Sequence, residues 1–125
     1  MPNDSLRERS LSDSLVQKTL AQEAIGNGGF GQLYSITGYS DPPVVLKYFD
    51  DTKFNPQQYH NARLAQLAIQ QRNQQRKDEV EFLKALKHRG VVQYVGCVKD
   101  GENIVGIFMR LVENKTLAEC KFLII

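Results

Sequence analysis

Three glycines and one lysine in the first half of the chain are the residues best suited to bind phosphate. Gly26, Gly28 and Gly31 lie close together, and Lys47 ends an apolar run that follows them. Glycine lets the backbone come within hydrogen-bonding distance of phosphate oxygens, an approach that a β-carbon would obstruct. A lysine one hairpin later can place its ammonium group on the same phosphates. The pattern therefore indicates a site for a nucleoside triphosphate.

The spacing of these glycines also occurs in dinucleotide-binding folds, so the residues after them decide between the two interpretations. A dinucleotide fold needs a helix that starts at the last glycine, because the phosphate meets the N-terminus of that helix. Here Gly31 is followed by a strand pattern and then by Pro42-Pro43. The glycines are therefore expected to cap a β-hairpin, and a nucleotide-dependent oxidoreductase is disfavoured.

Glu79 is the acidic residue expected to pair with Lys47. It lies on the same predicted helix face as Leu83 and Leu86, the face that must pack against a sheet. A carboxylate there costs several kcal/mol to desolvate unless a cation pairs with it, and a lysine on an apolar strand has the same difficulty. One alternative is an exposed glutamate with a lysine that extends to solvent. Glu81, which is rotated off this face, is the competing helix acid.

The whole chain predicts about five strands and one main helix. Residues 1–16 are polar and are expected to form a flexible leader, and an extended pattern follows from about 19 to 49. A helix rich in glutamine, largely solvated, is expected from about 57 to 86. Further strands are expected near 91–95 and 104–112. These elements indicate an α+β fold.

Taken in order, these motifs resemble the small N-terminal lobe of eukaryotic-type protein kinases. The segments that carry the resemblance are the glycine-rich loop, Val44-Val45-Leu46-Lys47, Glu79-Val80-Glu81-Phe82-Leu83, Leu86-Lys87-His88, Val91-Val92 and Ile107-Phe108-Met109. The resemblance implies an α+β, kinase-like small lobe with a five-stranded antiparallel sheet and one main helix, the large lobe being absent. It places the lobe at residues 17–118, with a glutamine-rich helical insertion at about 55–76 and a truncated tail at 119–125.

The resemblance also implies a role for each residue of an ATP site. Lys47 and Glu79 would be the catalytic pair, with Lys47 on the α and β phosphates and Glu79 holding it. The glycine-rich loop would cover the phosphates, apolar side chains would enclose the adenine, and the backbone after a gatekeeper methionine would hydrogen-bond its edge. The remaining site residues are Ile25, Gly26, Gly28, Gly29, Phe30, Gly31, Leu33, Val45, Met109, Arg110 and Val112.

The sequence departs from the kinase pattern in three ways. Lys47 and Glu79 are farther apart than is usual in the family, and Leu33 and Val45 are bulkier than the residues common at those sites. No segment resembles the His-Arg-Asp, Asp-Phe-Gly or Ala-Pro-Glu motifs, which orient the acceptor hydroxyl and hold magnesium. We therefore expect the chain alone not to catalyse, and magnesium to bind only in a full-length kinase. The alternative function is a stand-alone, non-catalytic interaction module.

Composition limits the other classes of function. With 42% hydrophobic and 24% charged residues the chain is ordinary for a globular domain, and its net charge of +2 does not favour nucleic acid or a membrane. The two cysteines form no metal-ligand or disulfide pattern, and the first residues are too polar for a signal peptide. A cytoplasmic protein is expected, with ATP and a protein substrate or scaffold as partners.

Two interpretations of the N-terminal leader stay open. Ser10 and Ser12 each have an arginine three residues before them, so phosphorylation could regulate the segment. The other interpretation is an unstructured tail.

Overall fold

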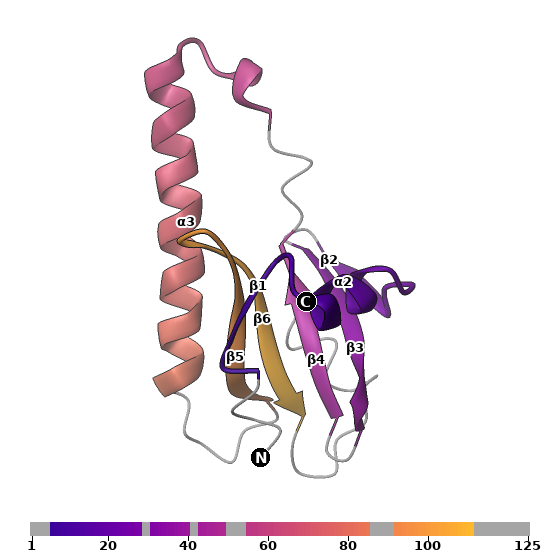
Figure 1. The fold of residues 1–125 in the computed structure, drawn as a ribbon. Coiled ribbons are helices and arrows are strands. Elements are labelled where there is room, and N and C mark those ends of the chain that lie inside the picture. Colours follow the sequence, from indigo (N-terminus) through magenta and orange to yellow (C-terminus); the bar gives the residue numbers. More distant parts are fainter. Residues whose placement is uncertain (1–5, 29–30, 41–42, 50–54, 86–91, 112–125) are drawn as a thin grey trace.

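The computed structural model describes residues 6–28, 31–40, 43–49, 55–85 and 92–111, which form one six-stranded sheet and two α-helices (Figure 1). In chain order the elements are β1 (Glu8–Ser10), α2 (Ser14–Leu20), β2 (Gly26–Gly28), β3 (Gly31–Ser40), β4 (Pro43–Tyr48), the 3-10 turn η2 (Pro56–Gln58), α3 (Ala62–Ala85), β5 (Val92–Asp100) and β6 (Asn103–Leu111). The α+β class agrees with the sequence. No helix among these residues is long and apolar enough to cross a membrane.

The sheet is mixed, and this corrects the expectation of five antiparallel strands. Its order is β1-β5-β6-β4-β3-β2, and every neighbouring pair is antiparallel except β1 and β5, which are parallel. The extra strand comes from the segment expected to be a flexible leader. Leu6 and Val16 are fully buried there, so a few apolar side chains in a polar segment suffice to hold it on the sheet.

The N-terminal segment is held by backbone bonds and by a helix cap. Cys97 N–H donates to the carbonyl oxygen of Arg7 (3.2 Å). Asp13 is the N-cap of α2, accepting from the backbone of Leu15 (2.9 Å), and it forms an ion pair with Arg9 (2.9 Å). Burial raises the pKa of Asp13, but the hydrogen bonds from Arg9 and the helix backbone outweigh it, so the pKa lies below its ordinary value of 3.8.

A close approach of two backbones determines where this segment lies. A β-carbon at Gly96 would collide with the carbonyl oxygen of Leu6, so only glycine lets the chain pass at this distance. The segment from Leu6 to Ser12, which we call the strap, therefore depends on a glycine about ninety residues later in the chain.

The main helix is shorter at its start than the sequence suggests. Residues 57–61 lie outside α3, and Asn61 caps the helix by accepting from the backbone N–H of Leu64 (2.9 Å). The C-terminal half of α3 lies beside β5 and β6, whereas its N-terminal half extends beyond the end of the sheet (Figure 1). The glutamine-rich part of the helix is thus mostly exposed, as its composition suggests.

Two apolar clusters cover opposite faces of the sheet. Alternate residues of β4 contribute to each, because side chains of a strand point to opposite faces in turn. The first cluster faces α3 and contains Leu33, Val45, Phe49, Val80, Cys97, Ile104, Ile107 and Met109. The second faces α2 and contains Leu6, Val16, Tyr34, Ile36, Val44, Leu46, Val98, Val105 and Phe108. Lys47 alternates with the second set, so it points toward α3.

Candidate functional site

The ion pair predicted from the sequence is present. Lys47 lies on β4, between Leu33 of β3 and Ile107 of β6 in the register of the sheet. Its Nζ donates to Glu79 Oε1 of α3 at 2.6 Å, across 32 residues of sequence. The side chains are 13% and 32% exposed, so the lysine is the more deeply buried partner. The pair ties the helix to the centre of the sheet and leaves the ammonium two further donors.

Arg76 is a site residue that the sequence analysis missed. It lies one turn before Glu79 on α3 and is only 7% exposed. Its Nη1 donates to the carbonyl oxygen of Ile104 (3.2 Å), and its guanidinium lies 4.6 Å from the centre of the Phe49 ring. Lys47 Nζ lies 5.6 Å from the same ring. Arg76 and Phe49 thus connect α3 to the sheet next to the ion pair, through cation–π contacts and one hydrogen bond.

A sequence signal for Arg76 exists, but it is weak. Arg76 and Glu79 are three residues apart, a spacing that places both on one side of a helix. An arginine among glutamines nevertheless suggests a solvated face, because arginine is seldom buried without partners. Its partners here are a backbone carbonyl and an aromatic ring, and neither is marked by a sequence motif.

The residues predicted to enclose adenine lie on the same face of the sheet as Lys47. Leu33, Val45 and Met109 are 0%, 1% and 1% exposed and belong to the cluster that packs against Val80 of α3. Ile25 is half-buried and packs against that cluster. A base could contact the three buried side chains only if the cluster were uncovered on this side. The structure gathers these residues around Lys47 but does not present them as an open surface.

The glycine-rich segment forms a hairpin, as the sequence predicts. Gly26 pairs with Leu33 and Gly28 with Gly31, and Gly31 begins β3 rather than a helix. The structure therefore lacks the strand-to-helix turn that a dinucleotide site needs among the residues it describes. A β-carbon at Gly31 would collide with the carbonyl oxygen of Tyr48, so packing of β3 on β4 explains this glycine without a ligand.

Three predicted site residues, Gly29, Phe30 and Val112, lie outside the described residues. Arg110 lies on β6, one residue after Met109, and its Nη1 donates to Gln93 Oε1 at 3.3 Å. Its backbone role toward a base remains a prediction.

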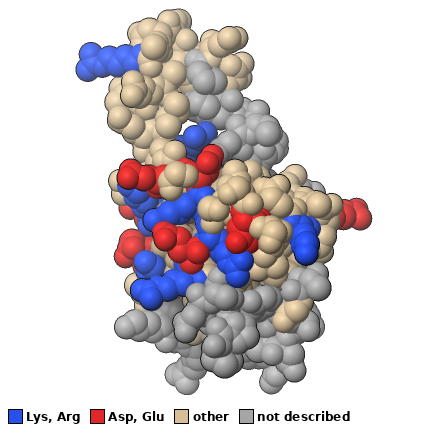
Figure 2. Space-filling model, in the orientation of Figure 1, with Lys and Arg blue, Asp and Glu red and all other residues tan. Residues whose placement is uncertain are grey.

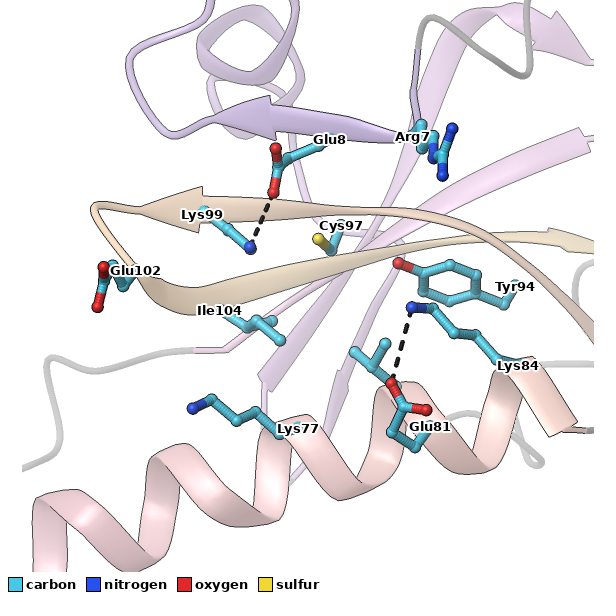
Figure 3. Close-up of a pocket in the computed structure, with 11 residues that line it drawn as sticks. Arg7, Glu8, Lys77, Glu81, Lys84, Tyr94, Cys97, Lys99, Glu102 and Ile104 are labelled. Carbon is cyan, nitrogen blue, oxygen red and sulfur yellow. Dashed lines mark ion pairs between the residues drawn. The ribbon is translucent and has the colours of Figure 1, made fainter.

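A separate cavity of about 750 Å³ lies between α3, β5 and the strap (Figure 3). Its apolar lining includes Val80 of α3, Cys97 of β5 and Ile104 of β6, and most of its other lining residues are charged. Tyr94 also lines this cavity. Burial raises the pKa of its hydroxyl group, and the neighbouring Cys97 raises it further, so the phenol stays protonated. Acidic and basic side chains are interspersed over this face, without a large patch of one sign (Figure 2). None of the described residues that were predicted to bind nucleotide lines this cavity.

Comparison with known proteins identifies no family. No protein-family model matches the chain, and no curated protein matches it. Within the described part of the chain, no group of three or more histidine, cysteine, aspartate or glutamate side chains could hold a metal ion. The function is therefore inferred from the arrangement of the residues themselves.

Proposed function

We propose that this chain binds ATP and forms the small lobe of a protein-kinase-like phosphotransferase. The observation that carries the proposal is the 2.6 Å ion pair between Lys47 and Glu79, next to the glycine hairpin in the sheet. In this role Lys47 holds the α and β phosphates, and Glu79 keeps the lysine extended toward them.

The energetics of the pair favour a functional role over a structural one. A partly buried ion pair is weak evidence for stability, because the cost of desolvating two charges offsets most of their attraction. Apolar residues of similar size would serve the core as well. An oriented ammonium group, however, supplies something an apolar side chain cannot, since it binds a phosphate as a positive point charge.

The succession of elements also supports the proposal. A glycine hairpin made by β2 and β3 leads to β4 with Lys47, then to α3 with Glu79, and then to the β5–β6 hairpin. This is the order in which the sequence motifs resemble a kinase small lobe. The parallel strand β1 is an addition to that order and lies at the far edge of the sheet from the glycines.

The phosphate end and the base end of the proposed site fit ATP unequally. Lys47 and Glu79, the proposed phosphate end, are already paired and partly exposed, whereas Leu33, Val45 and Met109 of the proposed base end are buried. Binding of the base would therefore require the apolar cluster to open on that side. When bound, ATP supplies the γ-phosphoryl group for a protein hydroxyl, and transfer needs an acceptor-orienting aspartate and magnesium ligands in addition to this lobe.

Direct binding of ATP tests the proposal. We expect the purified chain to be stabilised by ATP in a thermal-shift assay, and Lys47→Met to weaken binding by at least about 10-fold, which corresponds to roughly 1.4 kcal/mol. Lys84→Met is the matched control, because Lys84 also lies on α3 but is 51% exposed, with Glu81 at 3.7 Å and the Tyr94 ring at 5.4 Å as its neighbours. Absence of binding at millimolar ATP by a folded chain, or equal loss in both variants, would contradict the proposal.

A second candidate function is a non-catalytic interaction module, and the exposure of α3 favours it. The half of the helix that extends beyond the sheet carries Leu64 and Leu67, which are 41% and 45% exposed. Such a helix can place its apolar side chains in a groove of another protein. A protein partner lost on Leu67→Glu, together with no response to ATP, would favour this function over the first.

A further inference from the structure

The strap carries two serine hydroxyl groups that touch each other. Ser10 and Ser12 are exposed, and their Oγ atoms lie 3.1 Å apart. The backbone around them is held to β5, because Leu11 N–H donates to the carbonyl oxygen of Lys99 at 2.8 Å. Arg7 and Arg9 stand three residues before the two serines. The pair of hydroxyls thus lies at the end of an edge strand, with a basic residue at the same offset from each.

We propose that Ser10 and Ser12 form a paired phosphorylation site for an ATP-dependent serine kinase, acting in trans, that recognises arginine three residues upstream. In each transfer, serine Oγ forms a bond to the γ-phosphorus of ATP and the bond from that phosphorus to the β–γ bridging oxygen breaks. The hydroxyl proton passes to a base of the modifying enzyme, and ADP leaves. This proposal is independent of whether the chain itself binds ATP.

A first phosphate on Ser10 has a cation within the sheet register. Ser10 lies opposite Lys99 in the β1–β5 pair, and Lys99 Nζ now contacts Glu8 Oε1 at 2.8 Å (Figure 3). A phosphoserine carries up to two negative charges and three acceptor oxygens, so it competes well with a carboxylate for this ammonium. The hydroxyl of Ser12 can then donate to the phosphate. One phosphate is therefore compatible with a docked strap.

A second phosphate is not compatible with the same conformation. It would place two phosphate groups on oxygens that are 3.1 Å apart, in a segment whose sequence is flanked by the acidic residues Glu8 and Asp13. Arg9 already pairs with Asp13, so Lys99 and Arg7 would have to balance two phosphates of up to two negative charges each, together with Glu8. The strap is held on the sheet by the three-residue strand β1 and by the buried side chain of Leu6. Few contacts therefore oppose the repulsion between the two phosphate groups. Double phosphorylation should therefore release the strap and remove one wall of the cavity in Figure 3.

The first experiment tests the site itself. The full chain is incubated with an arginine-directed serine kinase and ATP, and phosphate is located by tandem mass spectrometry. Ser14 and Ser35 are exposed but have no arginine three residues before them, so they serve as internal controls. We expect about 10-fold more label on Ser10 and Ser12 than on the controls. Equal label on the controls, or none on the strap, would overturn the proposal.

A pair of arginine variants separates recognition from accessibility. Arg7→Ala should remove label from Ser10 and leave Ser12 labelled, because Arg9, three residues before Ser12, is unchanged. This variant also keeps the ion pair between Arg9 and Asp13 at the cap of α2. Arg9→Ala should remove label from Ser12, although it also weakens the cap of α2. Loss of both labels in Arg7→Ala, or of neither in both variants, contradicts the assignment of one arginine to each serine.

The second experiment tests release of the strap. Hydrogen exchange is measured at the amides of Cys97 and Leu11, which bond across the strap and β5. We expect the singly phosphorylated Ser12→Ala chain to exchange within about 3-fold of the unmodified chain, and the doubly phosphorylated chain to exchange about 10-fold faster or more. Retained protection after double phosphorylation, or a chain that accepts only one phosphate, would overturn the two-step release.

Discussion

The contact between Lys47 and Glu79 predicts that the two partners are unequal in their effect on stability. Two unit charges 2.6 Å apart attract by about 6 kcal/mol at an effective dielectric constant near 20, and desolvation offsets most of this. Removing one partner costs about 3–5 kcal/mol when the other stays fully buried, and about 0–1 kcal/mol when the pair is exposed. The outcome therefore depends on which charge is left behind and how much water it reaches.

We expect Glu79→Gln to be the more destabilising change. It leaves the ammonium of Lys47, only 13% exposed, without its carboxylate, at a cost of about 2 kcal/mol. Lys47→Met leaves a carboxylate that is 32% exposed and can turn toward water, and methionine refills the apolar path of the lysine stem. That change should cost about 1 kcal/mol. The double variant should cost about 1.5 kcal/mol rather than the sum, a coupling of about 1.5 kcal/mol.

Urea unfolding of the four chains, monitored by circular dichroism, measures this cycle. Glu81→Gln is the control, because Glu81 is 73% exposed and lies 3.7 Å from Lys84, and it should change the free energy of unfolding by less than about 0.5 kcal/mol. Equal or reversed costs for the two single variants, or additive costs in the double variant, would refute the reasoning. Additive costs would mean that solvent screens the pair as fully as it screens a surface pair, and reversed costs would mean that the carboxylate left behind is the costlier charge.

Three further changes test the burial of Arg76, the docking of the strap and the cap of α2. Arg76→Lys should lower the free energy of unfolding by about 1–2 kcal/mol, as measured by urea titration. A lysine ammonium cannot both reach the carbonyl oxygen of Ile104 and stack on the Phe49 ring as the planar guanidinium does. Gly96→Ala should undock the strap, which fast hydrogen exchange at the Cys97 amide would report. Gly38→Ala is the control, because Gly38 has a φ of 92° but open space around it. It should lower the free energy of unfolding by about 1 kcal/mol and leave exchange at the Cys97 amide unchanged. The lowered pKa of Asp13 contributes stability that is fully present above pH 3.8 and is lost as the pH falls through the folded-state pKa. Asp13→Asn should therefore make the urea midpoint fall less steeply between pH 6 and pH 3 than it does in the unmodified chain. An unchanged slope would contradict this expectation.

Local patterns determined the central part of this fold. A hairpin at the glycines, a strand that ends near Lys47 and a long helix with Glu79 follow from residue periodicity and from turn residues. The ion pair could be predicted because two charges on apolar faces are costly unless they meet. Each of these inferences uses information that lies within one element or in a pair of complementary charges.

Only the tertiary structure decided how the strap and Arg76 are placed. The strap is polar and short, and its parallel pairing with β5 depends on backbone hydrogen bonds that any sequence can make. What selects the partner is the space above Gly96, far away in the chain. Arg76 is buried against a carbonyl oxygen and a ring contributed by other elements, and no local pattern records either. Side chains of complementary charge can be recognised from the sequence. The pairing of distant backbone segments, and the room that a glycine leaves for one of them, are determined only when those segments come together in the fold.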